Sequence, residues 1–375
     1  MSSTDLGARN CGAILVAFAA FSSIASPLHA QYVARVLARG NFSATIAEDS
    51  TLGSQVGQGY VNDVTHAILW QDHTANPIDL HPSGYSQSEA WGISNSSQVG
   101  RGMDANSVWR PLLWHGTADS VVDLLPAGFS TAHAAGVAGN VQVGQGRASD
   151  QTYHALMWQG TATSAIDLHP AGYTVSGAVG TDGASQVGSG NSRAMLWKGS
   201  AESAVILGNG DYQFSTAINV SGDSQVGFGV HPGLGSPRDA ILWRGTAESA
   251  VVLNPAGVQN ATANDVYGNT QVGSYSVAPL GISHAALWRG SADTMLDLHQ
   301  YLTDLPSPVS FSTAVSIAEN GDIFGYAFNW DDVTGDNPPP PYIIVWHPVP
   351  EPVALTTMLV GLGTLSLCTR RRLNS

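Results

Sequence analysis

The feature that most constrains the fold of this chain is an internal repeat built from two recurring phrases. One phrase ends in tryptophan and occurs seven times, with the tryptophans 44, 44, 39, 46, 45 and 58 residues apart at positions 70, 114, 158, 197, 243, 288 and 346. Upstream of each tryptophan stands Gln-Val-Gly, altered in the last copy to Ile323-Phe324-Gly325. Self-similarity at this period indicates one supersecondary unit per copy, packed against its neighbours.

Each copy divides into four short segments with strand character. The third copy predicts strands near residues 131–137, 141–144, 154–158 and 165–168, separated by Gly, Asn, Ser and Pro. Such spacing is typical of consecutive antiparallel hairpins. Charged residues make up only 11% of the chain and glycines number 42, which favours strands and turns over amphipathic helices. Four strands per 40 to 45 residues is the period of a β-propeller blade.

The two ends of the repeat region complement each other. The seventh copy lacks its fourth strand, and residues 33–37 resemble the fourth strand of another copy, residues 121–125. An N-terminal strand that completes the last blade would close the ring and remove two exposed sheet edges. We therefore predict an all-β, seven-bladed propeller of four-stranded antiparallel blades over residues 31–348, closed by its N-terminal strand. Six or eight blades, or a β-solenoid, remain alternatives.

In such a ring the first strand of each copy would lie nearest the axis, where the blades crowd together. Its residues are small, as that position requires: Ala90, Ala132, Ala134, Ala178, Thr216, Ala217, Ala261, Ala263, Thr313 and Ala314. The repeated tryptophans are then expected to pack between blades rather than to bind sugars, because a sugar site would not need one copy in every blade.

Both termini carry targeting signals. Residues 1–30 contain Arg9, an apolar run and then Leu28-His29-Ala30, which together predict a cleaved secretory signal peptide. Residues 349–375 contain Pro350, Glu351 and Pro352, followed by an apolar stretch over residues 353–368 and the cluster Arg370, Arg371 and Arg372. The stretch is a short candidate transmembrane segment, and the arginines would hold its end on the cytoplasmic side.

This three-part tail resembles the PEP-CTERM sorting signal. The resemblance implies export across the inner membrane of a Gram-negative bacterium and processing by an exosortase-type membrane enzyme as partner, with the C-terminal segment in the membrane before processing. An anchor that is never processed remains the alternative. The repeat itself resembles the HAF-type extracellular repeat at His66-Ala67-Ile68, at 154–156 and at 284–286, which also implies an extracellular location.

Charge and side-chain chemistry narrow the function. The formal net charge of −14 argues against nucleic acid as a partner. The histidines His66, His154 and His284, and the acids Asp79, Asp123, Asp167 and Asp297, occupy equivalent positions in separate copies. They would therefore point to separated places around a ring and are expected to make structural hydrogen bonds rather than one metal site.

The copies differ most in the connection between their second and third strands. This connection is longest in copies five to seven, at residues 230–238, 275–283 and 327–341. The last one contains candidate calcium ligands in Asp331, Asp332 and Asp336, and candidate binding residues in Asn329, Trp330 and Asn337. A polar loop without any ligand is the competing interpretation.

These observations favour an exported, non-enzymatic surface or matrix protein that binds exopolysaccharide or a surface protein, with biofilm association and calcium as possibilities left open. Purely structural display is a third reading. The alternative is a secreted polysaccharide lyase or glycosidase whose site lies at the mouth of the propeller channel. The small, mostly uncharged first strand argues against such a catalytic cluster, and no catalytic motif stands out.

Overall fold

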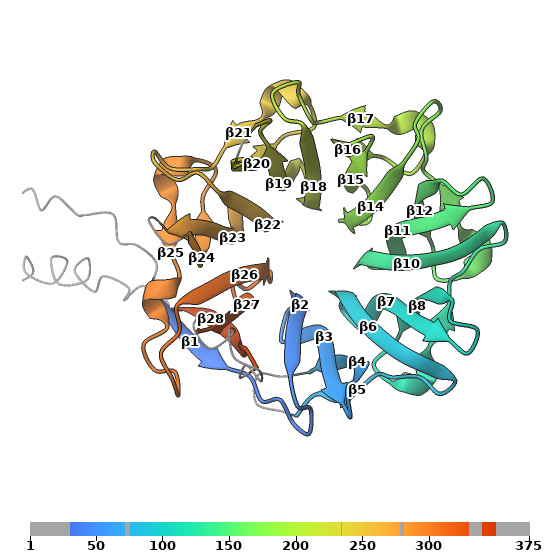
Figure 1. Cartoon of the computed structure of the whole chain (residues 1–375), viewed down its shortest axis with the longest axis horizontal. Coiled ribbons are helices and arrows are strands. Elements are labelled where there is room, and N and C mark those ends of the chain that lie inside the picture. Colours follow the sequence, from blue (N-terminus) through green and yellow to red (C-terminus); the bar gives the residue numbers. More distant parts are fainter. Residues whose placement is uncertain (1–30, 72–75, 234, 278–280, 330–339, 350–375) are drawn as a thin grey trace, which may run out of the picture.

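The chain forms a ring of seven four-stranded antiparallel sheets, seen down its axis in Figure 1. This computed structural model describes residues 31–71, 76–233, 235–277, 281–329 and 340–349. The predicted signal peptide, the sorting residues Pro350, Glu351, Pro352 and Arg370 to Arg372, and five of the loop candidates, 330–332 and 336–337, lie outside these residues. The predicted seven-bladed propeller is confirmed.

The first four blades follow the chain in order, each from the axis outward. Blade 1 contains β2 (Thr45–Thr51), β3 (Ser54–Val61), β4 (Val64–Trp70) and β5 (Ile78–Asp79). Blade 2 contains β6 (Tyr85–Ser94), β7 (Ser97–Asp104), β8 (Trp109–Trp114) and β9 (Val122–Asp123). Blade 3 contains β10 (Phe129–Ala138), β11 (Val141–Ala148), β12 (Tyr153–Trp158) and β13 (Ile166–Asp167). Blade 4 contains β14 (Ser176–Thr181), β15 (Gln186–Gly190), β16 (Arg193–Trp197) and β17 (Val205–Ile206).

The remaining blades repeat this order. Blade 5 contains β18 (Phe214–Ser221), β19 (Ser224–Val230), β20 (Arg238–Trp243) and β21 (Val251–Val252). Blade 6 contains β22 (Ala261–Tyr267), β23 (Thr270–Val277), β24 (Ile282–Trp288) and β25 (Leu296–Asp297). Blade 7 contains β26 (Phe311–Ile317), β27 (Ile323–Phe328), β28 (Tyr342–Val349) and, as its outermost strand, β1 (Gln31–Val36).

Short 3₁₀ turns lie between the third and fourth strands of blades 2 to 6. They are η1 (Ala118–Ser120), η2 (Ala162–Ser164), η3 (Ala201–Ser203), η4 (Ala247–Ser249) and η5 (Ala292–Thr294), while η6 (His299–Tyr301) opens the connection to blade 7. Within the described part of the chain, no helix has the length and apolar character needed to cross a membrane.

The N-terminal strand closes the ring as the sequence predicts. β1 pairs antiparallel with β28, in a register that runs from Gln31 opposite Val349 to Val36 opposite Ile344. The buried ring of Tyr32 packs at 5.9 Å from the ring of Tyr301, which belongs to η6. Blade 7 is therefore completed by the start of the chain and held there by the connection from blade 6.

The glycine of the Gln-Val-Gly phrase is explained by a β-bulge in the innermost strand of every blade. In blade 3 the register between β10 and β11 shifts between Ala134 and Gly136, which leaves Ala135 as the extra residue. A Cβ atom on Gly144 would lie 2.0 Å from the carbonyl oxygen of His133, and the other six blades show the same clash at 1.9 to 2.0 Å. Because that neighbour is backbone, only glycine fits there.

The glutamine of the same phrase fixes the turn after the repeated tryptophan. In blade 3, Oε1 of Gln142 accepts the backbone N–H of Gly160 at 2.7 Å, and Gly160 has a φ of +81°. The same bond joins the glutamine and glycine of blades 2, 4, 5 and 6. In blades 2 to 6 the Gln-Val-Gly phrase thus links strand two to the turn that leaves strand three.

The seven repeated tryptophans form the contacts between blades. Each has at most 1% of its surface exposed. Trp114 of blade 2, for example, packs against Val56, Leu69 and Leu80 of blade 1. The prediction that these tryptophans pack between blades is confirmed, and they are not available to a ligand.

Candidate binding site in the axial channel

A cavity of about 800 Å³ runs along the axis of the ring. The innermost strands of all seven blades line it, together with Tyr326 from β27 of blade 7. Its volume lies within the range of ligand-binding pockets. The channel is therefore large enough to admit a small molecule or the end of a polymer.

The bulge decides which side chains face this channel. Its extra residue in each blade lines the cavity: Glu48, Trp91, Ala135, Val179, Ile218, Asn264 and Val315. Two of these are large polar or aromatic groups, and they stand in the neighbouring blades 1 and 2. The seven-fold equivalence of the repeat is broken at this position.

The residue after the extra one is glycine in three consecutive blades. These are Gly92, Gly136 and Gly180, in blades 2, 3 and 4. A Cβ atom on Gly180 would lie 2.4 Å from the carbonyl oxygen of Ile218 in the next blade. The innermost strands of blades 2 to 5 therefore approach each other too closely for a side chain.

The other four blades place polar side chains at that position, here named the polar belt: Asn219, Asp265, Ser316 and Asp49. Asp265 accepts the backbone N–H groups of Val266 and Ile317, both at 2.7 Å. Asn219 donates to the same carboxyl at 2.5 Å. The belt thus joins these blades through side-chain hydrogen bonds.

Asp49 repeats this arrangement between blades 1 and 2. Its carboxyl accepts the backbone N–H groups of Ser50 at 2.8 Å and of Ile93 at 3.0 Å. Burial raises the pKa of Asp49 to about 7 and that of Asp265, which is 6% exposed, to about 8. Because backbone and amide donors already occupy these oxygens, the belt holds the ring together and is not a free ligand set.

A second group of side chains lines the channel, here named the mouth cluster: Glu48, Trp91, His133 and Tyr326. Glu48 accepts a hydrogen bond from Nε2 of Gln58 at 3.0 Å. Burial, reinforced by the negative charges of Glu89 and Asp49, raises the pKa of Glu48 to about 7. Its carboxyl therefore exchanges protons near neutral pH and would be stabilised in its ionised form by a cation.

Trp91 rests on a rigid support. The guanidinium carbon of Arg101 lies 4.6 Å from the centre of the Trp91 ring and 3.9 Å from that of Trp109. Glu89 fixes the same guanidinium through two hydrogen bonds of 2.8 and 3.2 Å. Such a stack orders the indole before any ligand arrives, which reduces the entropy lost on binding.

His133 completes the mouth cluster from blade 3. Its ring lies 5.2 Å from that of Trp91 at 75°, in an edge-on arrangement. Burial, with a contribution from the charge of Arg101, lowers the pKa of His133 to about 4, so the imidazole is neutral near pH 7. Among the described residues its ring nitrogens have no hydrogen-bond partner, and they can serve a ligand as one donor and one acceptor.

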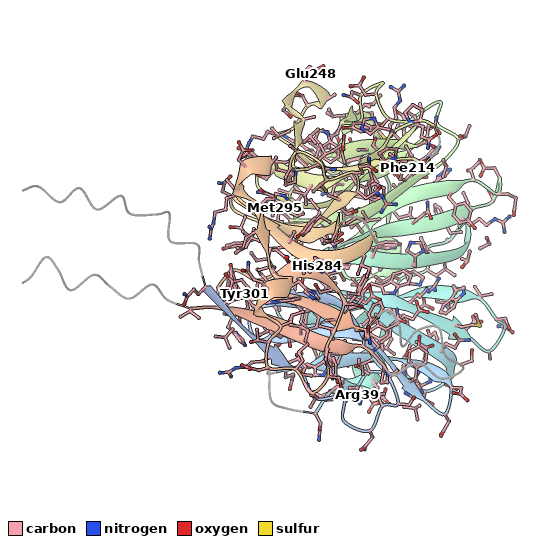
Figure 2. The ribbon with its side chains drawn as sticks, turned by 60° about the vertical axis from the view of Figure 1, so that its left-hand side comes forward. Arg39, Phe214, Glu248, His284, Met295 and Tyr301 are labelled. Atoms are coloured by element: carbon pink, nitrogen blue, oxygen red, sulfur yellow. The ribbon has the colours of Figure 1, made fainter. Side chains whose placement is uncertain are left out.

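The histidines singled out in the sequence lie away from the channel. His66, His154 and His284 bond to Asp79, Asp167 and Asp297 at 2.8, 2.7 and 3.1 Å. A second histidine stacks on each of them at 3.9 to 4.1 Å: His81, His169 and His299. His284 is labelled on blade 6 in Figure 2.

The second histidine of each pair fastens two blades. In blade 6, Nδ1 of His299 lies 2.8 Å from Oγ of Ser312, and that oxygen accepts the backbone N–H of Ala285 at 2.9 Å. Ser312 is 0% exposed, so this serine and histidine form a structural bridge and not a nucleophile. The sequence predicted structural hydrogen bonds for the first histidine of each pair, but it did not predict that the second histidine stacks on the first.

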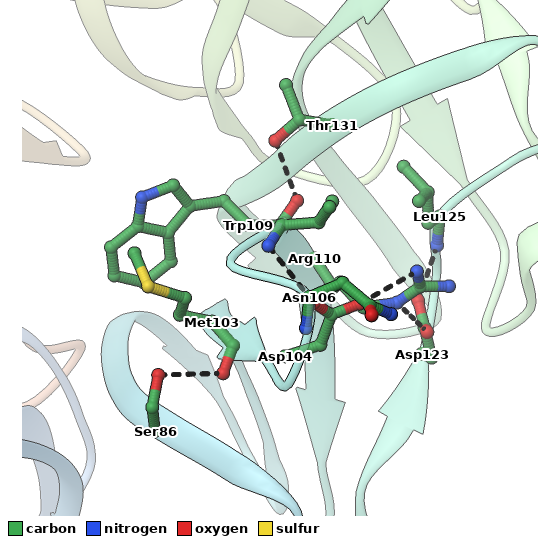
Figure 3. Close-up of polar contacts among 10 residues, drawn as sticks. Ser86, Met103, Asp104, Asn106, Trp109, Arg110, Asp123, Leu125 and Thr131 are labelled. Carbon is green, nitrogen blue, oxygen red and sulfur yellow. Dashed lines mark hydrogen bonds and ion pairs between the residues drawn. The ribbon is translucent and has the colours of Figure 1, made fainter.

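Blade 2 replaces the histidine with an arginine, as Figure 3 shows. Arg110 bonds to the carboxylate of Asp123 and also reaches Asp104 at 3.4 Å. Asp123 in turn accepts the backbone N–H of Leu125 at 2.9 Å. The repeated aspartate therefore caps the turn that follows the outermost strand in this blade, as it does in the histidine-bearing blades.

The long connections of copies five to seven are described only in part. In blade 5, His231 bonds to Asp239 at 2.8 Å and packs at 4.8 Å from the ring of Tyr212. This contact places the long connection beside the entry to the innermost strand. Of the seventh copy's candidates, Asn329 accepts a hydrogen bond from Ser310 at 3.1 Å. The assignments to Trp330, Asp331, Asp332, Asp336 and Asn337 stay predictions.

Comparison with known proteins bears on the fold alone. No protein-family model matches the chain, and no curated protein matches it. Among solved structures, a puromycin hydrolase shares 12% identity over 81% of this chain and 52% of its own, with a TM-score of 0.52. TolB from Acinetobacter baumannii shares 11% identity over 68% of this chain and 63% of its own, with a TM-score of 0.43. The chain thus spans about half the length of the hydrolase, and the likeness supports the propeller fold without assigning a function.

Proposed function

We propose that this chain is an exported, non-enzymatic propeller that binds a glycan at the mouth cluster of its axial channel. The observation that carries the proposal is the preorganised Trp91, flanked in a ligand-sized cavity by the hydrogen-bonding groups of Glu48 and His133. Glycan sites combine an aromatic platform for the apolar face of a sugar ring with a few polar side chains. The predicted signal peptide and sorting tail support a place at the cell surface or in the extracellular matrix of a Gram-negative bacterium.

The export part of the proposal has its own partners. An exosortase-type enzyme would process the tail at the Pro350-Glu351-Pro352 motif, and exopolysaccharide would be the ligand outside the cell. Mass spectrometry of the protein released by the producing cells tests this part. We expect a chain that begins near Gln31 and lacks the Arg370 to Arg372 cluster, and an intact tail would contradict sorting by cleavage.

A glycan array tests the binding part. The ring, residues 31–349, would be compared with Trp91→Ala and with a deletion of residues 330–339. Loss of binding in Trp91→Ala alone supports the channel site. Loss in the deletion alone would move the site to the seventh connection, and a ring that binds no glycan would overturn the proposal.

A polysaccharide lyase or glycosidase remains a second candidate because of one pair of carboxyls. The pKa of Glu48 is raised to about 7, whereas Glu89 is held by Arg101 as an ion pair. Two carboxyls in such different surroundings are the pattern of an acid and a base. Incubation with polysaccharides that the ring binds tests this candidate: we expect no new reducing or unsaturated ends, and turnover that Glu48→Gln abolishes would replace the binding function.

A further inference from the structure

Among the described residues that line the channel, the side chains that can carry a charge near neutral pH are carboxyls. Four carboxyl groups line it, those of Glu48, Asp49, Asp182 and Asp265, and the described lining residues include neither lysine nor arginine. Arg101 lies behind Trp91, and its charge is already paired with Glu89. Because the pKa values of Glu48, Asp49 and Asp265 are raised to about 7, 7 and 8, a cationic group in this channel would favour their ionised form, whereas an anionic group would oppose it.

Most of these carboxyls are already bonded to backbone groups. Asp265 and Asp49 accept from neighbouring strands, and Asp182 accepts the backbone N–H groups of Ser185 and Gly222. Glu48 differs, because within the described part of the chain its carboxyl bonds only to the amide of Gln58, through Oε1. Its other carboxyl oxygen is thus the group best placed to receive a donor from a ligand.

From these observations we propose that the channel selects a glycan that carries protonated amino groups, such as a glucosamine oligomer, over N-acetylated, neutral or acidic glycans. The inference rests on the proposed glycan-binding function and names its ligand class. The ammonium group would bond to the carboxylate of Glu48, while the pyranose ring stacks on Trp91 and a hydroxyl bonds to His133. Uronate-rich polymers would be repelled by the same carboxyls.

The arrangement favours a sugar over a free polyamine. The guanidinium of Arg101 already stacks on one side of the Trp91 ring. Its positive charge weakens the cation–π interaction that the ring could make with a second cation. The indole is therefore better suited to the apolar face of a sugar ring than to an ammonium group. Other side chains with hydroxyl or amide groups also line the cavity, among them Ser94, Ser221, Asn264 and Thr313, and they suit sugar hydroxyls.

Calorimetric titration of the ring with four probes tests this inference: glucosamine trimer, N-acetylglucosamine trimer, galacturonic acid trimer and spermidine. We expect the glucosamine trimer to bind at least about tenfold more tightly than each of the others, with an affinity that falls as salt is raised. Equal binding of the N-acetylated trimer would overturn the inference and leave the proposed function standing. Spermidine binding as tightly as the trimer would also overturn it, and a ring that binds no glycan would overturn both.

Variants of one residue sharpen the result. Glu48→Gln should remove the preference for the amino sugar, while Glu48→Asp, which keeps the charge, should retain most of it. Glu248→Gln is the matched control, because Glu248 is exposed on the outer rim of blade 5 (Figure 2). If Glu48→Gln has the same melting temperature as the unaltered ring and still prefers the amino sugar, Glu48 does not bind the amino group and the inference fails.

Discussion

Asp265 of blade 6 accepts the backbone N–H of Ile317 of blade 7 at 2.7 Å, so one carboxyl joins the innermost strands of two blades. The equivalent positions in blades 2 to 4 are glycines, packed directly against the next backbone. The ring therefore closes by two different devices at one structural position. Close backbone contact serves one side of the channel, and polar side chains serve the other.

Asp265 should make stability depend on pH. Burial raises its pKa from 3.8 to about 8, so the folded ring favours the protonated carboxyl. This contribution to the free energy of unfolding is complete below about pH 4, and it is lost as the pH rises towards 8. Urea denaturation at several values between pH 5 and 8 should show a falling difference between the unaltered ring and Asp265→Asn. The exposed Asp119→Asn is the control, and a difference that does not vary with pH would contradict the assignment.

His299 should act in the opposite direction. Burial, reinforced by neighbouring His284, lowers its pKa below 6.5. Its contribution to stability is present above pH 6.5 and is lost as the pH falls below that value. The unaltered ring should therefore lose more stability between pH 7 and 5 than His299→Asn does. Equal losses in parallel denaturation series would show that His299 does not sense pH.

Gly144 should tolerate no side chain. In Gly144→Ala the new Cβ would meet the carbonyl oxygen of His133 at 2.0 Å, and the innermost strand would have to move. We expect a loss of about 3 kcal/mol or failure to fold, by chemical denaturation. Gly210→Ala is the matched control, since nothing lies within 4 Å of its Cβ position, and its stability should change by less than about 0.5 kcal/mol. Similar stabilities for the two variants would refute the steric explanation.

Substitution of two tryptophans, Trp197 and Trp91, should distinguish a role in packing from a role in binding. Trp197 is fully buried against Val143, Ala155 and Leu168 of blade 3, and Trp197→Ala should cost about 3 to 5 kcal/mol of stability. Trp91 is only partly buried, and Trp91→Ala should weaken glycan binding with a smaller loss of stability. Thermal melting and titration of both variants check this contrast, which fails if Trp91→Ala unfolds as readily as Trp197→Ala.

Removal of β1 should open the ring. A chain that begins at Leu37 leaves β28 without its outer partner, and each lost backbone hydrogen bond costs about 1 kcal/mol. We expect a lower melting temperature and self-association through the free edge, seen by size-exclusion chromatography. Val33→Ala, which alters an exposed side chain of the same strand, should remain monomeric. A monomeric ring after the deletion would mean that β1 does not close it.

The fold could be predicted from the sequence because its signals repeat. A tryptophan is buried between neighbouring blades throughout the ring. In every blade the glycine of the second phrase lies so close to a backbone oxygen that no side chain fits there. The seventh copy lacks its fourth strand, and residues 33–37 resemble a fourth strand, so the sequence also predicted that β1 closes the ring. The predicted second strand was too short, residues 141–144 instead of Val141–Ala148, because the glycines within it hide its regular pairing with Tyr153–Trp158.

The mouth cluster could not be predicted from the sequence, for a geometric reason. Small alanines dominate the innermost strands, and the polar residues Glu48 and His133 stand at different positions of the repeat, so no alignment of the copies brings them together. The bulge adds one residue, which changes the side that the following side chains face. Trp91 was obscured because the seven repeated tryptophans are all buried. Trp91 does not occupy one of the seven repeated tryptophan positions, and this departure was the signal that could have identified the mouth cluster.

The pairing of Gln31 with Val349 gives the ring a cyclic connectivity. A short linker between these two adjacent residues would leave every strand with its present neighbours, whichever blade the chain entered first. New termini could then be opened between β13 and β14, in the connection from blade 3 to blade 4 across the ring from blade 7 (Figure 1), without removing a single strand pairing. The molecule should therefore accept circular permutation, and a permuted ring would carry a fused domain on either side of the channel mouth.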